Sequence, residues 1–183
     1  MKNTALILVD VQNDYFPGGK FEQEGADAAA KKAAKALSEF RRRQMPVIHI
    51  CHENLNEAVD FFLLGSEGAK THVSVAPADK EKIILKHFPN SFRKTDLEQE
   101  LRSLGVERVV IVGMMTLMCI DATSRAASDL GFEVVVLHDA CAARALEFNG
   151  VKVSAPQVHA AFLAALQMFY AEVTDTASFL QTL

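Results

Sequence analysis

The feature that most constrains the fold is an alternation: strand-length apolar runs and longer helical segments follow one another along the 183 residues. The first run, TALILVD (4–10), is apolar without interruption from Ala5 to Val9, as expected for a strand covered on both faces. The other predicted strands are VIHIC (47–51), KIILK (82–86), RVVIVG (108–113), EVVVLHD (133–139) and AEVTD (171–175). This alternation is typical of parallel strands joined by right-handed helical crossovers. We therefore predict a three-layer α/β fold with a six-stranded parallel sheet, in a single domain spanning 1–183.

Four segments between these runs have helical character. The predicted helices are 27–43, 95–105, 118–130 and 155–171. The second has a capping signal, because Thr95 is followed three positions later by Glu98. The last is apolar almost all round and needs cover from the core or from another subunit. Residues 52–81 have no clean period, and so long an irregular stretch is usually functional or contains short elements of its own.

Composition and charge exclude several classes of function. A net charge of −4 provides neither a basic footprint for nucleic acid nor a polybasic patch for a membrane. Three cysteines, an odd number, do not form a disulfide framework and indicate a reducing compartment. The N-terminal apolar run is interrupted by Asp10 and is too short for a signal peptide or a membrane span. We therefore expect a cytoplasmic protein whose partner is a small molecule.

Three reactive side chains stand at or just beyond predicted strand ends, where open parallel sheets place their sites. Asp10 ends the first strand, Lys86 ends the third, and Cys119 lies where the fourth strand gives way to a helix. A helix N-terminus and a nearby ammonium both favour the reactive thiolate, and a carboxylate can take the thiol proton. Each residue alone has a structural explanation, as a buried thiol, a turn carboxylate or a solvated lysine. Together at one edge, they predict a nucleophilic cysteine whose sulfur is ionised.

The segments that carry these residues are similar to those of a known family. LILVDVQNDYF (6–16), KHFPNSF (86–92) and GMMTLMCIDATSRAASDLGFEVVVLHDAC (113–141) resemble the isochorismatase-like cysteine hydrolases, which include nicotinamidases, N-carbamoylsarcosine amidohydrolases and related amidases. The resemblance covers nearly the whole chain. It implies a Rossmann-like sheet with strand order 3-2-1-4-5-6, and a homodimer or a higher homo-oligomer.

The resemblance also implies roles for individual residues. Asp10, Lys86 and Cys119 correspond to a catalytic triad in which Cys119 is the nucleophile. A cis peptide bond is implied between Met114 and Met115, turning the Met115 amide toward the site. The amides of Met115 and Cys119 would then form the oxyanion hole. The implied reaction is hydrolysis of a C–N bond in an amide, imide or ureide through a thioester.

Other functions stay open. Enzymes that hydrolyse the vinyl ether of isochorismate need no thiol nucleophile, so Cys119 favours C–N cleavage over this alternative. The same thiol suits a redox or electrophile sensor with Cys141 as the resolving thiol, although a sensor has no need of the Asp10–Lys86 pair. A catalytically silent binding module on the same fold is a third reading, against which the intact triad argues. A dinucleotide-binding dehydrogenase is disfavoured, because no G-x-G-x-x-G follows the first strand.

Histidines and aromatic residues give further expectations about the site. Nicotinamidases of the family bind a metal through an Asp-x-His pair and a further histidine. His49, His52 and His72 have no such pair before them, so we predict neither a catalytic metal nor a cofactor. His49 lies within an apolar strand and is expected in the core, whereas His52 at the strand end is expected to contact substrate. Tyr15 and Phe92 flank the catalytic segments and are expected to wall the pocket.

Overall fold

The computed structural model describes residues 2–56 and 58–183, which form one six-stranded sheet and one two-stranded sheet. The large sheet consists of β1 (Thr4–Val9), β2 (Val47–His52), β3 (Lys82–Lys86), β4 (Arg108–Met114), β5 (Glu133–Ala142) and β8 (Glu172–Thr174). Its neighbouring strands are all parallel, in the order β3-β2-β1-β4-β5-β8. β8 is the sixth predicted strand, because the antiparallel hairpin of β6 (Leu146–Phe148) and β7 (Val151–Val153) precedes it. The predicted fold class and strand order are therefore confirmed.

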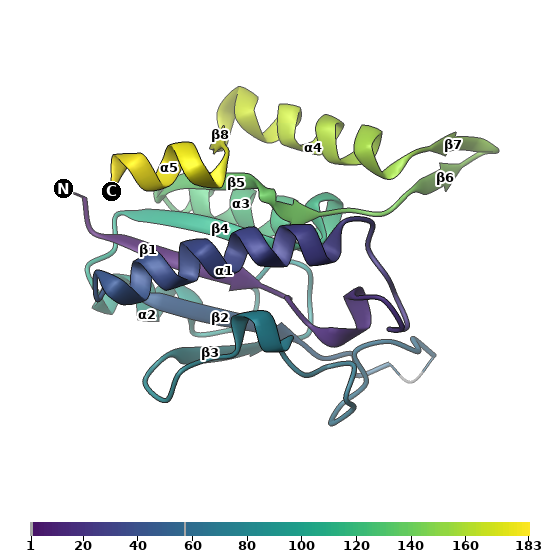
Figure 1. Cartoon of the computed structure of the whole chain (residues 1–183), viewed down its shortest axis with the longest axis horizontal. Helices are drawn as coiled ribbons and strands as arrows, with labels where there is room; N and C mark the ends of the chain where they lie inside the picture. Colours follow the sequence, from purple (N-terminus) through teal and green to yellow (C-terminus); the bar gives the residue numbers. More distant parts are fainter. Residues whose placement is uncertain (1, 57) are drawn as a thin grey trace.

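Helices cover both faces of this sheet (Figure 1). They are α1 (Ala26–Arg42), α2 (Leu97–Ser103), α3 (Asp121–Asp129), α4 (Ala155–Phe169) and α5 (Thr176–Thr182). Successive residues of β1 point to opposite faces. Leu6 and Leu8 join a core cluster with residues of α1 and α5, whereas Ile7 and Val9 join a second cluster with residues of α2 and α3. Cover on both sides explains why the first strand is apolar at consecutive positions.

The close approach of β1 and β4 at their carboxyl ends depends on a glycine. Val9 pairs with Gly113, which has φ +124°. A Cβ at Gly113 would lie 1.9 Å from the carbonyl oxygen of Val9, so only glycine fits here. The chain that leaves β1 and the chain that leaves β4 thereby emerge beside each other.

Two helix predictions were wrong in detail. α2 begins after Asp96, and the Thr95 hydroxyl donates to the Ser91 carbonyl at 2.6 Å, so the capping box predicted from Thr95 and Glu98 does not form. The helix predicted at 118–130 is a π-helical turn, η3 (Thr116–Ile120), followed by α3. The hairpin β6–β7 and α5 were not predicted, because three-residue strands and a seven-residue helix show too little periodicity.

α4 is apolar on several sides but is buried along one stripe. It begins with a capping box between Ser154 and Gln157. The buried stripe consists of Ala155, Val158, Leu163 and Leu166. Met168 and Phe169 are 71% and 85% exposed. The cover that the sequence analysis expected on every side of this helix is therefore not supplied by the described residues of the chain.

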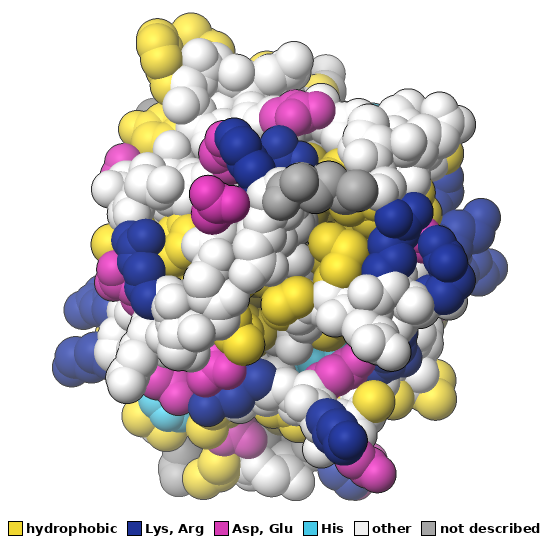
Figure 2. All heavy atoms as spheres, turned by 90° about the vertical axis from the view of Figure 1, so that its left-hand side faces the viewer, with side chains coloured by type: hydrophobic (Ala, Val, Ile, Leu, Met, Phe, Trp, Pro, Cys, Tyr) yellow, Lys and Arg dark blue, Asp and Glu magenta, His cyan; other side chains and the backbone are white. Residues whose placement is uncertain are grey.

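The face at which the strands begin carries charges of both signs, interspersed with small apolar areas (Figure 2). Among the ion pairs of this end, Arg108 lies 3.2 Å from Glu133, which also pairs with Lys2. Within the described ranges, no helix combines the length and the apolar character needed to cross a bilayer.

Candidate active site

Asp10 and Lys86 form a fully buried ion pair at the carboxyl edge of the sheet. Asp10 follows β1 with φ +49°, a left-handed conformation that non-glycine residues adopt mainly at turns and functional sites. Its amide donates to the Ile50 carbonyl at 3.0 Å, which fixes this backbone against β2. Lys86 is the last residue of β3, and its Nζ donates to Asp10 Oδ2 at 2.7 Å. Two buried charges are tolerated only when paired in good geometry, as they are here.

Cys119 joins this pair. It lies in η3, between β4 and α3, and π-helical turns of this kind are frequent at functional sites. Lys86 Nζ lies 3.3 Å from Cys119 Sγ, and the cysteine is 2% exposed. The three side chains that the strand ends indicated therefore meet in one buried cluster.

Burial opposes ionisation of the sulfur in this cluster. Burial raises the pKa of the Cys119 thiol far above its ordinary value, and the Asp10 carboxylate raises it further, while Lys86 offsets only part of this. Burial alone would lower the pKa of Lys86, but the Asp10 carboxylate, with a smaller contribution from Cys119, outweighs it and raises that pKa. Burial thus favours a neutral thiol beside the carboxylate–ammonium pair. The sequence analysis expected an ionised sulfur; desolvation opposes this ionisation and exceeds the stabilisation from one neighbouring cation.

One oxygen of the Asp10 carboxylate is left without a partner. Oδ2 accepts from Lys86, whereas Oδ1 is buried and has no hydrogen-bond partner among the described residues. A carboxylate oxygen of Asp10 and Cys119 Sγ lie within 4.8 Å of each other. A buried, unpaired carboxylate oxygen beside a thiol can accept the thiol proton or that of a water molecule.

His52, at the end of β2, contacts the cluster through a hydrogen bond with Lys86. Its Nδ1 lies 2.9 Å from Lys86 Nζ. Ligand atoms of Asp10, His52 and Cys119 lie within 4.8 Å of one another, a set whose chemistry would suit a metal ion. The Lys86 ammonium, however, already stands within 3.3 Å of one atom from each of them. These residues therefore do not fit a resident metal while Lys86 holds this position.

His49 and His72, the other two histidines considered in the sequence analysis, lie away from the cluster. His49 is buried in β2, and its Nε2 is 2.9 Å from Glu81 Oε2, which is the core placement that its strand predicted. The His72 ring stacks on Phe16 with centroids 3.7 Å apart, and its Nδ1 is 2.8 Å from Ser74 Oγ.

Gln12 is a site residue that the sequence analysis missed. Its side chain is buried, and Oε1 accepts from the His52 amide at 2.8 Å. Its Nε2 donates to the carbonyls of His52 at 2.8 Å and Ala69 at 2.6 Å. Gln12 thus fixes the end of β2 and ties it to the loop that follows. The available signal was a polar residue in the buried chain directly after the first strand.

Aromatic residues cover the cluster. Tyr15 is buried, and burial raises its pKa, with further contributions from the nearby Cys119 and Asp10. The Tyr15 ring lies 4.6 Å from that of Phe62, whose amide donates to the buried carboxylate of Asp14 at 2.6 Å. The loop between β2 and β3 therefore lies over the site.

Phe92 does not share this placement. Its ring stacks on Phe132, with centroids 6.2 Å apart, and Phe132 precedes β5 at the edge where the strands begin. The expectation that Phe92 walls the pocket was wrong, because its ring packs in the core instead. Met115 stands just before η3, after a cis peptide bond from Met114, and its carbonyl accepts from Met118 and Ile120.

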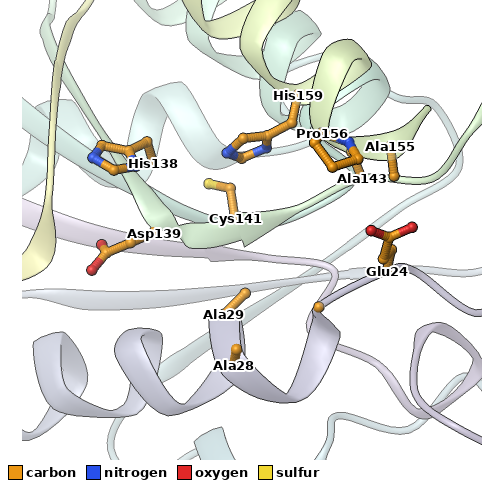
Figure 3. A pocket seen from close by; sticks show the side chains of 11 residues that line it. Glu24, Ala28, Ala29, His138, Asp139, Cys141, Ala143, Ala155, Pro156 and His159 are labelled. Atoms are coloured by element: carbon orange, nitrogen blue, oxygen red, sulfur yellow. The ribbon is translucent and has the colours of Figure 1, made fainter. Parts of the chain in front are cut away.

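A cavity of about 270 Å³ lies away from the cluster, between α1, β5 and α4 (Figure 3). Cys141 and His159 line it above Ala28 and Ala29 of α1. Burial raises the pKa of Cys141 to about 12, which suits an unreactive thiol. Neither Asp10, Lys86 nor Cys119 lines this cavity.

Comparison with known proteins is consistent with this geometry. The Isochorismatase domain model matches residues 4–178. Isochorismatase family protein YddQ of Bacillus subtilis is 46% identical over 178 residues, covering 97% of this chain and 99% of the relative. A solved structure from Oleispira antarctica, which bears the name isochorismatase hydrolase, is 51% identical with a TM-score of 0.95, covering 98% of this chain and 97% of that one. Streptothricin hydrolase of Streptomyces noursei is 31% identical over 136 residues, covering 74% of this chain and 48% of the relative.

Proposed function

Because this chain belongs to the isochorismatase family of hydrolases, we propose that it cleaves a C–N bond of a small amide, imide or ureide with Cys119 as nucleophile. The observation that carries the proposal is the cluster itself. Lys86 Nζ lies 2.7 Å from Asp10 Oδ2 and 3.3 Å from Cys119 Sγ, and Asp10 Oδ1 is free to accept a proton. A relative named for hydrolysis of streptothricin supports a small-molecule substrate.

The first half of the proposed reaction forms a thioester. Asp10 takes the proton of the Cys119 thiol as the sulfur attacks the carbonyl carbon, so that no free thiolate has to persist in the buried site. The oxyanion is stabilised by the amides of Met115 and Cys119, and each such donor is typically worth about 3 kcal/mol. Asp10 then gives its proton to the nitrogen, the C–N bond breaks, and the amine leaves.

The second half regenerates the enzyme. Asp10 takes a proton from water, the resulting hydroxide attacks the thioester carbonyl, and the C–S bond breaks. The sulfur recovers a proton from Asp10 and the acid leaves. Lys86 stays an ammonium throughout, holding Asp10 and stabilising negative charge as it moves between oxygen and sulfur.

A substrate has to open the site before it can react. Asp10, Lys86 and Cys119 are all 2% exposed or less, and Phe62 over them is fully buried. We place the opening in the β2–β3 loop, whose backbone is hydrogen-bonded to the side chains of Asp14 and Gln12. Opening of this kind gates many enzymes on the microsecond to millisecond scale.

The test incubates the protein with a panel of nicotinamide, N-carbamoylsarcosine, succinimide, 2-pyrrolidone and, for the ether reaction, isochorismate, and measures the release of ammonia or acid. We expect the wild type to hydrolyse at least one, Cys119→Ala to hydrolyse none, and Cys141→Ala, which removes another buried thiol, to match the wild type. Intact-protein mass should show an acyl adduct on Cys119. Turnover by Cys119→Ala would contradict the covalent step, and ether cleavage without amide cleavage would indicate the isochorismatase reaction instead.

A further inference from the structure

We infer that His52 is a positioning residue for the Lys86 ammonium and connects it to the loop that covers the site. This inference rests on the proposed function, since it assigns a role in the same reaction. It also replaces the expectation that His52 contacts substrate.

The placement of His52 follows from strand register. His52 is the last residue of β2 and Lys86 the last of β3, and the two are paired in register. Paired residues of neighbouring parallel strands point to the same face. Lys86 Nζ and His52 Nδ1 therefore meet at 2.9 Å, and Gln12 holds the His52 backbone through both its amide and its carbonyl.

The neighbouring hydrogen bonds determine which ring nitrogen carries the proton. Asn54 Nδ2 donates to the Phe61 carbonyl at 2.8 Å, so Asn54 Oδ1 is the atom that faces His52. That oxygen only accepts, and it lies 3.2 Å from His52 Nε2, so Nε2 carries the proton. His52 Nδ1 is then a bare acceptor, and the Lys86 ammonium donates to it.

This contact uses the last donor of the lysine. An ammonium has three N–H groups. Those of Lys86 are directed to Asp10 Oδ2 at 2.7 Å, His52 Nδ1 at 2.9 Å and Cys119 Sγ at 3.3 Å. With two donors held by Asp10 and His52, the third is aimed at the sulfur. Without His52 a buried donor would lack a partner, and the ammonium would be free to rotate away from Cys119.

The same bonds join the lysine to the covering loop. Asn54 also donates its backbone amide to the Phe62 carbonyl at 2.8 Å, so loop residues Phe61 and Phe62 are both held by Asn54. A continuous series of hydrogen bonds therefore runs from Phe61 through Asn54 and His52 to Lys86. Closing of the loop over substrate completes this series and sets the orientation of the ammonium.

Protonation of His52 would break the series, because an imidazolium has no acceptor. The groups that face the ring are Lys86 on β3, Asp10 after β1, Cys119 on η3, and His87 after β3. Burial and the Lys86 charge lower the pKa of His52. The ring is thus neutral at pH 7, and activity is lost as falling pH adds the proton.

The experiment compares two substitutions on the panel amide that the wild type hydrolyses fastest. His52→Asn places Oδ1 near the position of Nδ1 and keeps an acceptor that does not titrate, whereas His52→Ala removes the acceptor. We expect His52→Ala to lower kcat at least tenfold with KM within twofold. We expect His52→Asn to stay within threefold of wild-type kcat and to shift the acid limb of the pH profile to lower pH.

A loss that appears only in KM would indicate the substrate contact that was first expected, and would overturn the inference. So would equal losses in both variants, or wild-type behaviour of His52→Ala. Turnover by Cys119→Ala would instead contradict the proposed function, so the two failures are distinguishable.

A second measurement needs no substrate. Long-range ¹H–¹⁵N correlation spectra of the histidine rings should show His52 neutral at pH 7, with the proton on Nε2, in both wild type and Cys119→Ala. An Nδ1–H ring or an imidazolium at pH 7 would overturn the inference whatever the activity assays give.

Discussion

The Asp10 carboxylate and the Lys86 ammonium are joined by a 2.7 Å hydrogen bond, although they come from strands that are not neighbours in the sheet. β2 lies between β1 and β3, so the pair crosses over the end of β2, where His52 and its partner Gln12 lie. Neither charged side chain is exposed. The pair therefore depends on the register of three strands at once.

Removing one charge of this pair should destabilise the fold, and removing both should restore much of the loss. Lys86→Met leaves Asp10 buried without a counter-charge, at an expected cost of about 3–5 kcal/mol, and the double variant with Asp10→Asn should recover at least half. Urea unfolding followed by circular dichroism measures this. Lys82→Met on the same strand removes an exposed ion pair with Asp96 at 3.0 Å and should cost less than about 1 kcal/mol. Equal losses for Lys86→Met and Lys82→Met would contradict the burial argument.

Replacement by alanine should be tolerated far less at Gly113 than at Gly131, another glycine with a left-handed backbone. Gly113 and Gly131 have φ values of +124° and +87°, but a Cβ at Gly131 would meet nothing within 4 Å. Gly131→Ala should cost about 1–2 kcal/mol from backbone strain alone. Gly113→Ala adds a 1.9 Å clash with the Val9 carbonyl and should cost clearly more, or prevent folding. Similar melting temperatures for the two variants would show that β1 and β4 can separate without penalty.

The sequence was most informative for residues whose surroundings follow from their place within or at the end of a predicted strand. Strand-length runs predicted the parallel sheet, and the strand ends indicated Asp10, Lys86 and Cys119 without any knowledge of contacts. Phe92 was misplaced because a residue's distance along the chain from a reactive group does not determine which way its ring turns.

The contacts of His52 and Gln12 could not be predicted in this way. The pairing of His52 with Lys86 depends on the register between β2 and β3, and a shift of one residue would turn the ring to the opposite face. Gln12 acts through hydrogen bonds to the His52 and Ala69 backbones, which are set by a loop with no periodic pattern. The desolvation of Cys119 could not be predicted for a related reason, because it depends on how completely the surrounding chain closes over the sulfur.

Stability should fall as the pH drops below about 6.5, partly through His49. Burial lowers the pKa of His49 below its ordinary 6.5, against the smaller opposing effect of Glu81. The unfolded chain therefore takes up protons that the folded chain excludes, so stability is full above pH 6.5 and decreases by at most about 1.4 kcal/mol per pH unit for this group. Glu81, whose pKa is lowered to about 2 chiefly by Arg41, stays charged in this range.

The check is the free energy of unfolding in urea between pH 7 and pH 5 for the wild type and His49→Gln. The glutamine keeps a donor toward Glu81 but does not titrate, so its curve should be flatter. Some slope should remain, because burial also lowers the pKa values of His52 and His159. Parallel curves for the two proteins would contradict a contribution from His49.

We propose that the chain self-associates through α4 and the β6–β7 hairpin. The hairpin extends beyond the first turn of α4 (Figure 1) and exposes 82% of Phe148, while Met168 and Phe169 are exposed toward the other end of the helix. Exposed large apolar side chains on one element and its neighbour are consistent with a surface that contacts another chain. Light scattering after size exclusion should give a mass of at least two chains for the wild type. Phe148→Asp should lower that mass or raise the dissociation constant at least tenfold. Val73, which is 81% exposed on the separate turn η2 (Val73–Val75), provides the matched control, because Val73→Asp adds the same charge away from α4. A monomeric wild type, or equal effects of the two substitutions, would show that this apolar surface is not a contact between copies of the chain.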